Sequence, residues 1–304
     1  MEKTFWLQMA DDTEVFVKKW YNPSKQPKAI VQLAHGMVEH IERYKDFAEF
    51  LVENDFVVYG NDHRGHGKTG EQQGLMGYLS DKDGFQKTTD DLVKITEQIK
   101  QDYRNTPIFL LGHSMGSFLA RDYIREYSST IDGVILSGTG FYPRPVTILA
   151  KRIASGLPPK KESNLMNSLV FHSNNKRLKN KQTDFDWLSS DSKIVQGYMD
   201  DPLCGRIPTA RFFYDLMDGL TTIHNKNLNK TIRSDLPMML ISGTDDPIGD
   251  YGKGVWKTAS LYHEAGLENV VTMLFEQGRH ELLNEKNRDE VYQAILDWII
   301  VHNA

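Results

Sequence analysis

Apolar and polar positions repeat along the chain with two periods, which predict a sheet covered by helices. Short apolar runs predict buried strands at residues 29–36, 56–62, 107–114, 133–140, 237–246 and 270–278. Apolar residues at helical spacing predict helices at 42–54, 84–102, 115–127 and 288–302. Residues 3–21 predict a hairpin that turns at Asp11 and Asp12. Because all-apolar strands alternate with helices, we expect an α/β fold with a mostly parallel central sheet.

Two stretches depart from the alternation of strands and helices. Residues 63–74 are polar and rich in glycine, and they predict a loop. Residues 141–234 show no strand pattern, but Phe212, Leu216 and Leu220 form one helical stripe. A structureless loop of this length is uncommon in a compact domain. We therefore expect a core of residues 1–140 and 235–304, with residues 141–234 inserted as a helical cap.

Composition narrows the class of protein. The 304 residues carry a net charge of −5, which argues against a general nucleic-acid-binding role. The single cysteine, Cys204, has no intramolecular partner, as is usual in a reducing compartment, and we interpret it as a packed thiol. The N-terminus does not resemble a signal peptide, and no apolar run reaches the length of a membrane span. These features predict a cytoplasmic protein, whereas they leave its oligomeric state open.

The candidate nucleophile lies in the segment Gly112-His113-Ser114-Met115-Gly116, which matches the pattern G-x-S-x-G. The pattern is weak by itself, but here it stands between a predicted strand and a predicted helix, where it is diagnostic. The sharp bend strains the serine backbone, and the small residues at both ends relieve crowding. A turn built only for packing would need the glycines but not the serine.

A serine hydroxyl needs a base, and the base needs an acid that orients it. Since ligands bind at the carboxyl ends of parallel strands, both partners should follow strands. His280 follows the last predicted strand and is the candidate base. Aspartates follow the preceding strand at Asp245, Asp246 and Asp250, and local spacing does not separate Asp245 from Asp246.

The loop after the first buried strand should complete the site. An oxyanion needs backbone N–H donors, and we expect them at Met115, directly after the serine, and at Met37. Gly36 allows a close approach of that backbone, and the Met37 side chain should line the acyl site. We expect His35 and Glu39 to hold this loop by hydrogen bonds.

Five segments together resemble α/β-hydrolases of the monoacylglycerol lipase and lysophospholipase-like family, which is sometimes grouped with serine aminopeptidases. They are HGMVEHIERY, NDHRGHGKTG, LLGHSMGS, SGTDDPIGD and GRHELLNE. The resemblance covers nearly the whole chain, and it departs from the commonest form at Thr69, where serine is frequent. It implies Ser114, Asp246 and His280 as catalytic residues, and oxyanion donors at Met37 and Met115. His113 supports the site as part of the serine motif.

The resemblance also implies a reaction and its substrates. It points to hydrolysis of a small carboxylic ester, such as a monoacylglycerol or a lysophospholipid, without a metal or an organic cofactor. The same fold serves aminopeptidases, thioesterases, lactonases and some ligand-binding proteins without turnover. An aminopeptidase would need an acid for the substrate ammonium, and the cap offers Glu162, Asp184 and Asp186.

Two further features have competing interpretations. His63 and His66 have a spacing that suits a metal site, but no cysteine or carboxylate cluster accompanies them. The first part of the cap is basic, and such runs are usually solvated, although this one could also attract an anionic lipid surface. Its charged residues are Lys151, Arg152, Lys160, Lys161, Glu162, Lys176, Arg177, Lys179 and Lys181.

Overall fold

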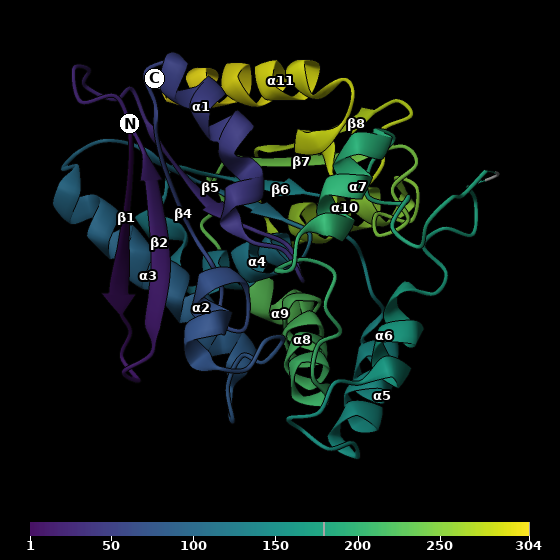
Figure 1. The fold of residues 1–304 in the computed structure, drawn as a ribbon. Helices are drawn as coiled ribbons and strands as arrows, with labels where there is room; N and C mark the ends of the chain where they lie inside the picture. The colour runs from purple at the N-terminus through teal and green to yellow at the C-terminus, as the bar shows by residue number, and fades with distance from the viewer. Residues whose placement is uncertain (179, 304) are drawn as a thin grey trace.

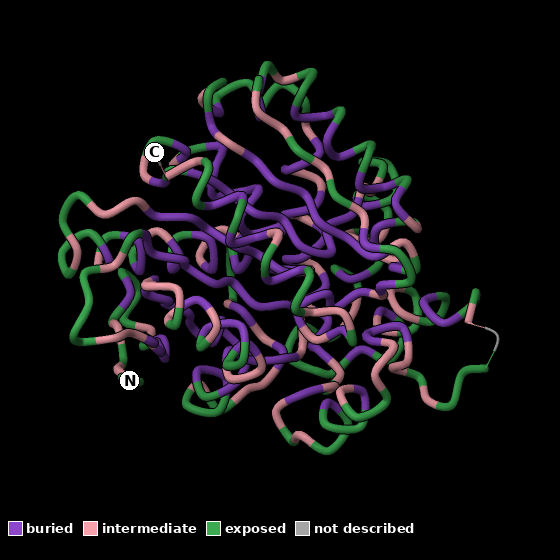
Figure 2. Tube along the Cα trace, turned by 90° about the horizontal axis from the view of Figure 1, so that it is seen from above, coloured by how far each residue is buried: buried purple, intermediate pink, exposed green. Residues whose placement is uncertain are grey.

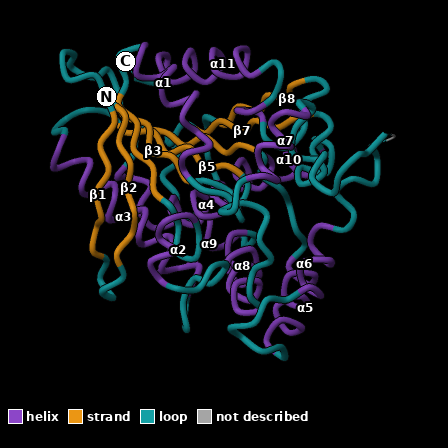
Figure 3. Tube along the Cα trace, viewed as in Figure 1, coloured by secondary structure: helices purple, strands orange, loops and turns teal. Residues whose placement is uncertain are grey.

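A twisted sheet of eight strands runs through the middle of the molecule (Figures 1 and 3). The computed structural model describes residues 1–178 and 180–303. The strand order is β1-β2-β4-β3-β5-β6-β7-β8, in which β2 runs antiparallel to both neighbours and all other pairs from β4 onward are parallel. The strands are β1 (Glu2–Gln8), β2 (Glu14–Trp20), β3 (Ile30–Ala34), β4 (Val57–Asn61), β5 (Ile108–His113), β6 (Gly133–Ser137), β7 (Met238–Gly243) and β8 (Val270–Phe275). The prediction of a mostly parallel α/β sheet is confirmed.

Helices cover both faces of this sheet (Figure 1). On one face α1 (Lys45–Glu53) and α11 (Arg288–Val301) pack over a cluster that includes Leu33, Phe109 and Ile295. On the other face lie α3 (Gly84–Asp102), α4 (Met115–Tyr127) and α10 (Lys253–Ala265), over Leu110 and Leu136. Short 3₁₀ turns join the elements at Ile41–Tyr44, Ser128–Thr130 and Leu282–Asn284.

The buried positions follow the central strands, as Figure 2 shows. Every residue of β3, β4, β5, β6 and β7 is buried, which explains their unbroken apolar pattern. The strand β8 differs, because Val271 and Met273 are exposed on the outer side of this edge strand. The two residues are two positions apart and therefore lie on the same face of β8, which is less covered than the faces of the central strands.

The segment between β6 and β7, residues 141–234, is called the insertion below, and no strand occurs in its described parts, 141–178 and 180–234. Its helices are α5 (Arg144–Ser155), α6 (Asn164–Phe171), α7 (Ser192–Asp200), α8 (Ala210–Ile223) and α9 (Lys226–Asn229). Helix α8 carries the predicted stripe of Phe212, Leu216 and Leu220, all of which are buried. The Thr209 hydroxyl begins this helix by accepting a hydrogen bond from the Phe212 N–H at 3.2 Å. Lys179 of the basic run lies outside the described residues.

The polar stretch at residues 63–74 was expected to be a loop, and this expectation is wrong for part of it. Residues Gly67–Gln73 form the short helix α2. The Asp62 carboxylate accepts a hydrogen bond from the Lys68 N–H at 2.7 Å, and the Thr69 hydroxyl donates to the Asp62 carbonyl at 2.8 Å. A side chain that precedes the helix therefore supplies the cap that hydrophobic periodicity cannot reveal. Thr69, which stands where serine is frequent in similar proteins, makes this contact with its hydroxyl group.

Within residues 1–178 and 180–303, no helix combines the length and the apolar character that crossing a membrane requires.

Candidate active site

The serine segment forms a sharp turn between β5 and α4. Ser114 has φ 50° and ψ −118°, a conformation that a residue with a side chain rarely adopts. The neighbouring glycines explain how the turn closes: a Cβ on Gly116 would lie 1.9 Å from the Ala34 carbonyl oxygen. A Cβ on Gly112 would lie 2.2 Å from the Gly116 oxygen. The strained serine is held by close packing that only glycine permits, as is common at functional sites.

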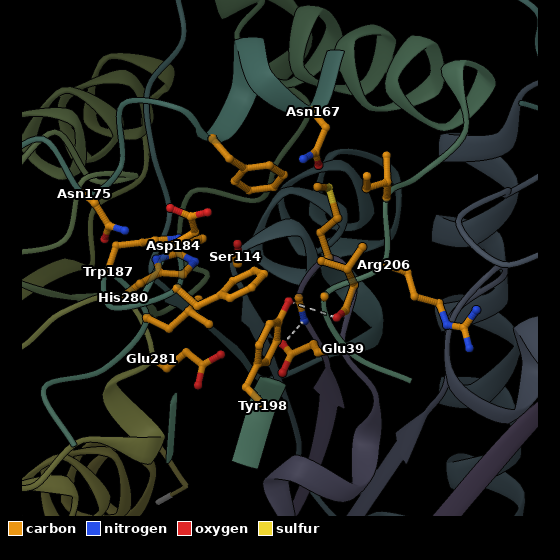
Figure 4. Close-up of a pocket in the computed structure, with 18 of the residues that line it drawn as sticks. Glu39, Ser114, Asn167, Asn175, Asp184, Trp187, Tyr198, Arg206, His280 and Glu281 are labelled. Carbon is orange, nitrogen blue, oxygen red and sulfur yellow. Dashed lines mark hydrogen bonds between the residues drawn. The ribbon is translucent and has the colours of Figure 1, made fainter. Parts of the chain in front are cut away.

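His280 and Asp246 meet at the carboxyl end of the sheet. His280 Nδ1 lies 3.0 Å from Asp246 Oδ1, and both side chains are buried. Burial acts to lower the pKa of His280, but the Asp246 carboxylate, together with Glu281 and Glu39, outweighs it, so that the pKa lies above the ordinary value of 6.5. His280 and Ser114 line the same cavity (Figure 4). Ser114, Asp246 and His280, which follow one another in this order along the chain, thus all lie at the carboxyl end of the sheet.

The structure distinguishes the two aspartates that the sequence left open. Asp245 is exposed, whereas Asp246 is fully buried. Asp246 Oδ1 also accepts a hydrogen bond from the Ile248 N–H at 2.9 Å, and Oδ2 accepts one from the Ser242 hydroxyl at 3.0 Å. Burial acts to raise the pKa of the Asp246 carboxyl, but His280 and the hydrogen bonds from Ile248 and Ser242 together hold it below its ordinary value. Only Asp246 is placed to orient His280.

The loop after β3 lies against the serine turn. A Cβ on Gly36 would lie 3.2 Å from the Ser114 Cβ, so the loop backbone passes directly beside the serine. Met37 lines the cavities on both sides of Ser114. Met115 is the first residue of α4, where N–H groups have no partner inside the helix. The two proposed oxyanion donors therefore belong to segments that flank Ser114.

Two cavities open on either side of Ser114. The larger, of about 740 Å³, carries polar and aromatic groups that include Glu39, Trp187 and Tyr198 (Figure 4). The smaller, of about 430 Å³, is lined mainly by apolar side chains of α4, α5, α6 and α8, such as Phe118. Ser114, Met37 and Phe171 belong to both walls. A molecule with one apolar and one polar end would thus place its junction at Ser114.

Known proteins are similar to this chain in fold and in sequence. Residues 25–287 match the family model described as serine aminopeptidase, S33. The chain belongs to this family. It is 28% identical to monoglyceride lipase of Rattus norvegicus over 95% of this chain and 86% of that protein. It is 25% identical to monoacylglycerol lipase of Mycolicibacterium smegmatis over 93% and 91% of the two chains. The expected α/β-hydrolase family is thereby confirmed.

A solved structure agrees over the whole length of this S33-family chain. A thermostable carboxyl esterase from Bacillus coagulans, crystallised with glycerol, superposes with a TM-score of 0.93 at 28% identity. The alignment covers 100% of this chain and 99% of the esterase. The insertion therefore has a counterpart in that structure and is part of the shared architecture.

Buried histidines support the loop after β3 in this family member. The His63 N–H donates to His35 Nε2 at 2.9 Å, so the remaining proton of His35 is on Nδ1, which lies 2.7 Å from the Gly36 oxygen. Burial lowers the pKa of His63 to about 3 and that of His66 to about 4. The three rings pack together, with 4.1 Å between the centroids of His35 and His63. They are neutral and structural in this arrangement.

His113 lies beside the candidate base. Its ring centroid is 4.7 Å from that of His280, and its Nδ1 lies 3.4 Å from the Ser137 hydroxyl. Burial lowers the pKa of His113 to about 4, so this ring adds no charge next to His280 at neutral pH. On another side the Trp187 ring of the insertion lies 4.9 Å from His280.

One cluster of potential metal ligands occurs within the described residues, at His40, Asp201 and Cys204. The side-chain donor atoms lie within 4.8 Å of one another, but His40 Nε2 is already 2.8 Å from Asp201 Oδ2. A cation would have to replace that hydrogen bond. Burial raises the pKa of the Cys204 thiol, in line with its interpretation as a packed group.

Sequence reasoning missed several residues that shape the site, namely Arg43, Trp187, Tyr198 and Glu281. Arg43 and Glu281 are charged residues in motifs where charge normally indicates exposure. Trp187 and Tyr198 reach the site from an insertion whose path the sequence does not define. The only available signal for Glu281 was its position directly after His280.

Proposed function

We propose that this protein is a serine hydrolase that cleaves carboxylic esters with Ser114, His280 and Asp246. The observation that carries the proposal is the position of the strained Ser114 between a mainly apolar cavity and a larger one with many polar groups. His280, whose Nδ1 lies 3.0 Å from Asp246 Oδ1, lines the larger cavity together with Ser114. Ser114 attacks the acyl carbon while His280 takes its proton and later passes it to the leaving alcohol. Asp246 orients the ring and stabilises its charged form. Water then releases the acid.

The main-chain N–H groups of Met37 and Met115 are the proposed oxyanion donors. They flank Ser114 from two separate segments, and a tetrahedral intermediate on Ser114 would place its oxygen between them. His35 and Glu39 stabilise the loop that carries Met37. This reaction needs neither a metal nor an organic cofactor, because each proton has an acceptor among the named side chains.

The substrate class follows from the two cavities. The apolar cavity between α5, α6 and α8 fits a medium or long acyl chain, and the polar cavity fits the alcohol part. Monoacylglycerols and lysophospholipids have this division, and two of the relatives described above carry monoacylglycerol or monoglyceride lipase in their names. We propose the insertion as a cap that forms both binding walls.

The insertion also offers a surface for lipid. Four apolar side chains on α5 and α6 are more than half exposed, and three of them line the apolar cavity as well. They are Val146, Leu149, Leu165 and Leu169. Of the basic residues nearby, Lys151 and Lys160 already form ion pairs with Asp218 and Asp81. We therefore propose that apolar contact, rather than charge alone, brings the cap to a lipid surface.

Ester hydrolysis is tested with p-nitrophenyl esters of increasing acyl length and with Ser114→Ala as the matched variant. The variant should lose on the order of 10⁴-fold or more in kcat/KM. Rates should rise with acyl length until the apolar cavity is filled, since each buried methylene adds about 0.8 kcal/mol. A fluorophosphonate probe should label Ser114, and equal turnover by the variant would reject the assignment.

An aminopeptidase is the second candidate, and one observation favours it. Of the three acids considered for the substrate ammonium, Asp184 lines the polar cavity. Asp186 instead accepts hydrogen bonds from the Gln182 N–H and the Thr183 hydroxyl, while Glu162 pairs through its backbone with Thr209. Amino-acid p-nitroanilides separate this activity from ester hydrolysis. A protein that labels with the probe but turns over neither substrate series would be a thioesterase or lactonase candidate, and one that does not label would be a binding protein.

The cytoplasmic location stays a prediction from the composition.

A further inference from the structure

A buried cluster of three charged residues connects the two loops that meet at Ser114. Arg43 Nη1 and Nη2 each donate to the Glu281 carboxylate at 2.6 Å, and Nη1 also donates to Glu39 Oε2 at 2.7 Å. The other Glu39 oxygen accepts hydrogen bonds from the Gly36 N–H at 2.5 Å and the Tyr44 hydroxyl at 2.7 Å. The contacts therefore run from the loop after β3 to the residue next to His280.

The cluster does not balance its own charge. Two carboxylates face one guanidinium, and the side chains of Glu39, Arg43 and Glu281 are only 3%, 11% and 4% exposed. The Tyr198 ring covers the guanidinium at 4.9 Å and separates it further from water. The Arg43 contact holds the pKa of Glu281 below its ordinary value despite burial, so the carboxylate is ionised. The formal charge of the three side chains is −1, and the cluster lies directly beside the candidate base.

Keeping such a charge buried is costly unless the fold gains something from it. Structural stability alone does not require two acids for one arginine. Both carboxylates line the polar cavity that also contains Ser114 and His280 (Figure 4). The only positive charge that the proposed reaction creates in this cavity is the imidazolium of His280, which forms as Ser114 attacks.

The groups around His280 come from several elements. Asp246 lies at Nδ1 on the β7 side, and the neutral His113 ring lies on the β5 side. Trp187 covers the ring from the insertion and carries no charge. Lys181 and Asp184 line the same cavity from the insertion, but both side chains are exposed and they lie 3.9 Å from each other. Besides Asp246, the buried carboxylates that act on His280 are those of Glu281, which directly follows it, and Glu39.

We propose that Glu39, Arg43 and Glu281 form a positioning cluster with two effects. It fixes the loop after β3, which carries Met37 and is called the oxyanion loop below, against the loop that carries His280, and it stabilises the protonated form of His280. The inference rests on the proposed serine hydrolase function. Burial acts to lower the pKa of His280, while Asp246, followed by Glu281 and Glu39, raises it. Arg43 sets the distance between the two loops through its two hydrogen bonds to the Glu281 carboxylate. The negative charge that Arg43 does not neutralise acts on the His280 ring.

Two substitutions separate these two effects. Glu281→Gln keeps the shape of the side chain but removes its charge. We expect kcat to fall about tenfold with little change in KM, and the acidic limb of kcat/KM to move to lower pH by about half a unit or more. Arg43→Lys keeps the charge but loses the fork geometry, so kcat should fall while the acidic limb keeps its position to within about 0.2 units.

A matched control is the exposed ion pair of Arg288 and Asp46, in which Nη1 and Oδ2 lie 3.0 Å apart. Arg288→Lys and Asp46→Asn should leave both kcat and the pH profile unchanged. Circular dichroism and melting curves establish which variants are folded. If Glu281→Gln does not fold, Glu281→Asp, which keeps the charge, should retain the position of the acidic limb, whereas Glu39→Gln should shift it downward.

Each part of the proposal has a result that would overturn it. A folded Glu281→Gln with an unmoved acidic limb overturns the electrostatic proposal, and a wild-type kcat in Arg43→Lys overturns the positioning proposal. Labelling of wild-type Ser114 by a fluorophosphonate probe provides the reference. If wild type is neither labelled nor active on esters, the proposed function fails; if it is labelled and active, only the cluster is in question.

Discussion

Asp246→Asn and Asp245→Asn form a sharp test of the acid, because the two residues are neighbours in sequence and differ in burial. Asp246 Oδ1 accepts from both His280 and Ile248, whereas Oδ2 accepts only from the Ser242 hydroxyl. An asparagine can therefore keep its oxygen at the Oδ1 position and turn its amide toward Ser242. That hydroxyl can donate to the Gly243 carbonyl instead, which is 3.4 Å away.

The expected loss follows from charge alone. Because the Ile248 N–H fixes the asparagine oxygen, His280 keeps its proton on Nδ1, and the tautomer needed for catalysis persists. What is lost is the attraction between Asp246 and the imidazolium. Two opposite charges about 4 Å apart interact by about 4 kcal/mol at an effective dielectric of about 20. This energy corresponds to about 10³-fold in kcat.

The assay is steady-state hydrolysis of a p-nitrophenyl ester across pH. Asp246→Asn should lose about 10³-fold in kcat, with the acidic limb at lower pH than in wild type. Asp246→Ala should lose more and also be less stable by about 1–3 kcal/mol, since it leaves the partly buried Ile248 N–H without the acceptor it has in wild type. Asp245→Asn should match wild type within about twofold. Equal losses in Asp245→Asn and Asp246→Asn would refute the reasoning.

Three further predictions use other features of the molecule. Gly116→Ala should lower the free energy of unfolding in urea by about 1–3 kcal/mol, because the new Cβ would meet backbone atoms. Gly197→Ala in α7 should raise it by about 0.5–1 kcal/mol, because its Cβ would have nothing within 4 Å. Equal effects of the two substitutions would contradict this reasoning. The proposed mechanism needs neutral His280, and its pKa is raised, so kcat/KM should fall as pH decreases, with a midpoint above 6.5; a midpoint below 6.5 would contradict control of the ring by Asp246. Leu169→Glu should weaken co-sedimentation with neutral and anionic vesicles alike, while hydrolysis of a soluble short ester persists; retention of vesicle binding would reject the apolar surface.

The sequence predicts the sheet well because its central strands are buried on both faces. Each of β3 to β7 appears as an apolar run, and the residue after each run lies at one edge of the sheet. Ser114 and His280 are therefore found by following strand ends, without knowledge of any contact. The same logic narrows the acid to a few aspartates but cannot select Asp246, since burial of one neighbour over the other depends on the path of the turn after β7.

What the sequence does not provide are the contacts made across long separations. Arg43 and Glu281 are 238 positions apart and look like surface residues, since nothing local indicates that each neutralises the other. Trp187 is held over His280 by backbone contacts between the insertion and the core, in which the His280 N–H donates to the Trp187 carbonyl at 3.3 Å and the Glu281 N–H to the Leu188 carbonyl at 2.7 Å. Helix α2 was missed for a related reason: its cap is a side chain outside the periodic pattern.

The insertion and the sheet contribute different parts of the site. Ser114, Asp246 and His280 come from strand ends of the core, whereas most of the apolar wall and much of the polar wall come from residues 141–234. The insertion also holds the oxyanion loop, since the Gly205 N–H and the Tyr198 hydroxyl both donate to the Val38 carbonyl, at 2.9 and 3.1 Å. A movement of the insertion would therefore alter substrate binding and oxyanion geometry together. For this reason substitutions at Tyr198 should change kcat as well as KM, although this side chain is no part of the proposed triad.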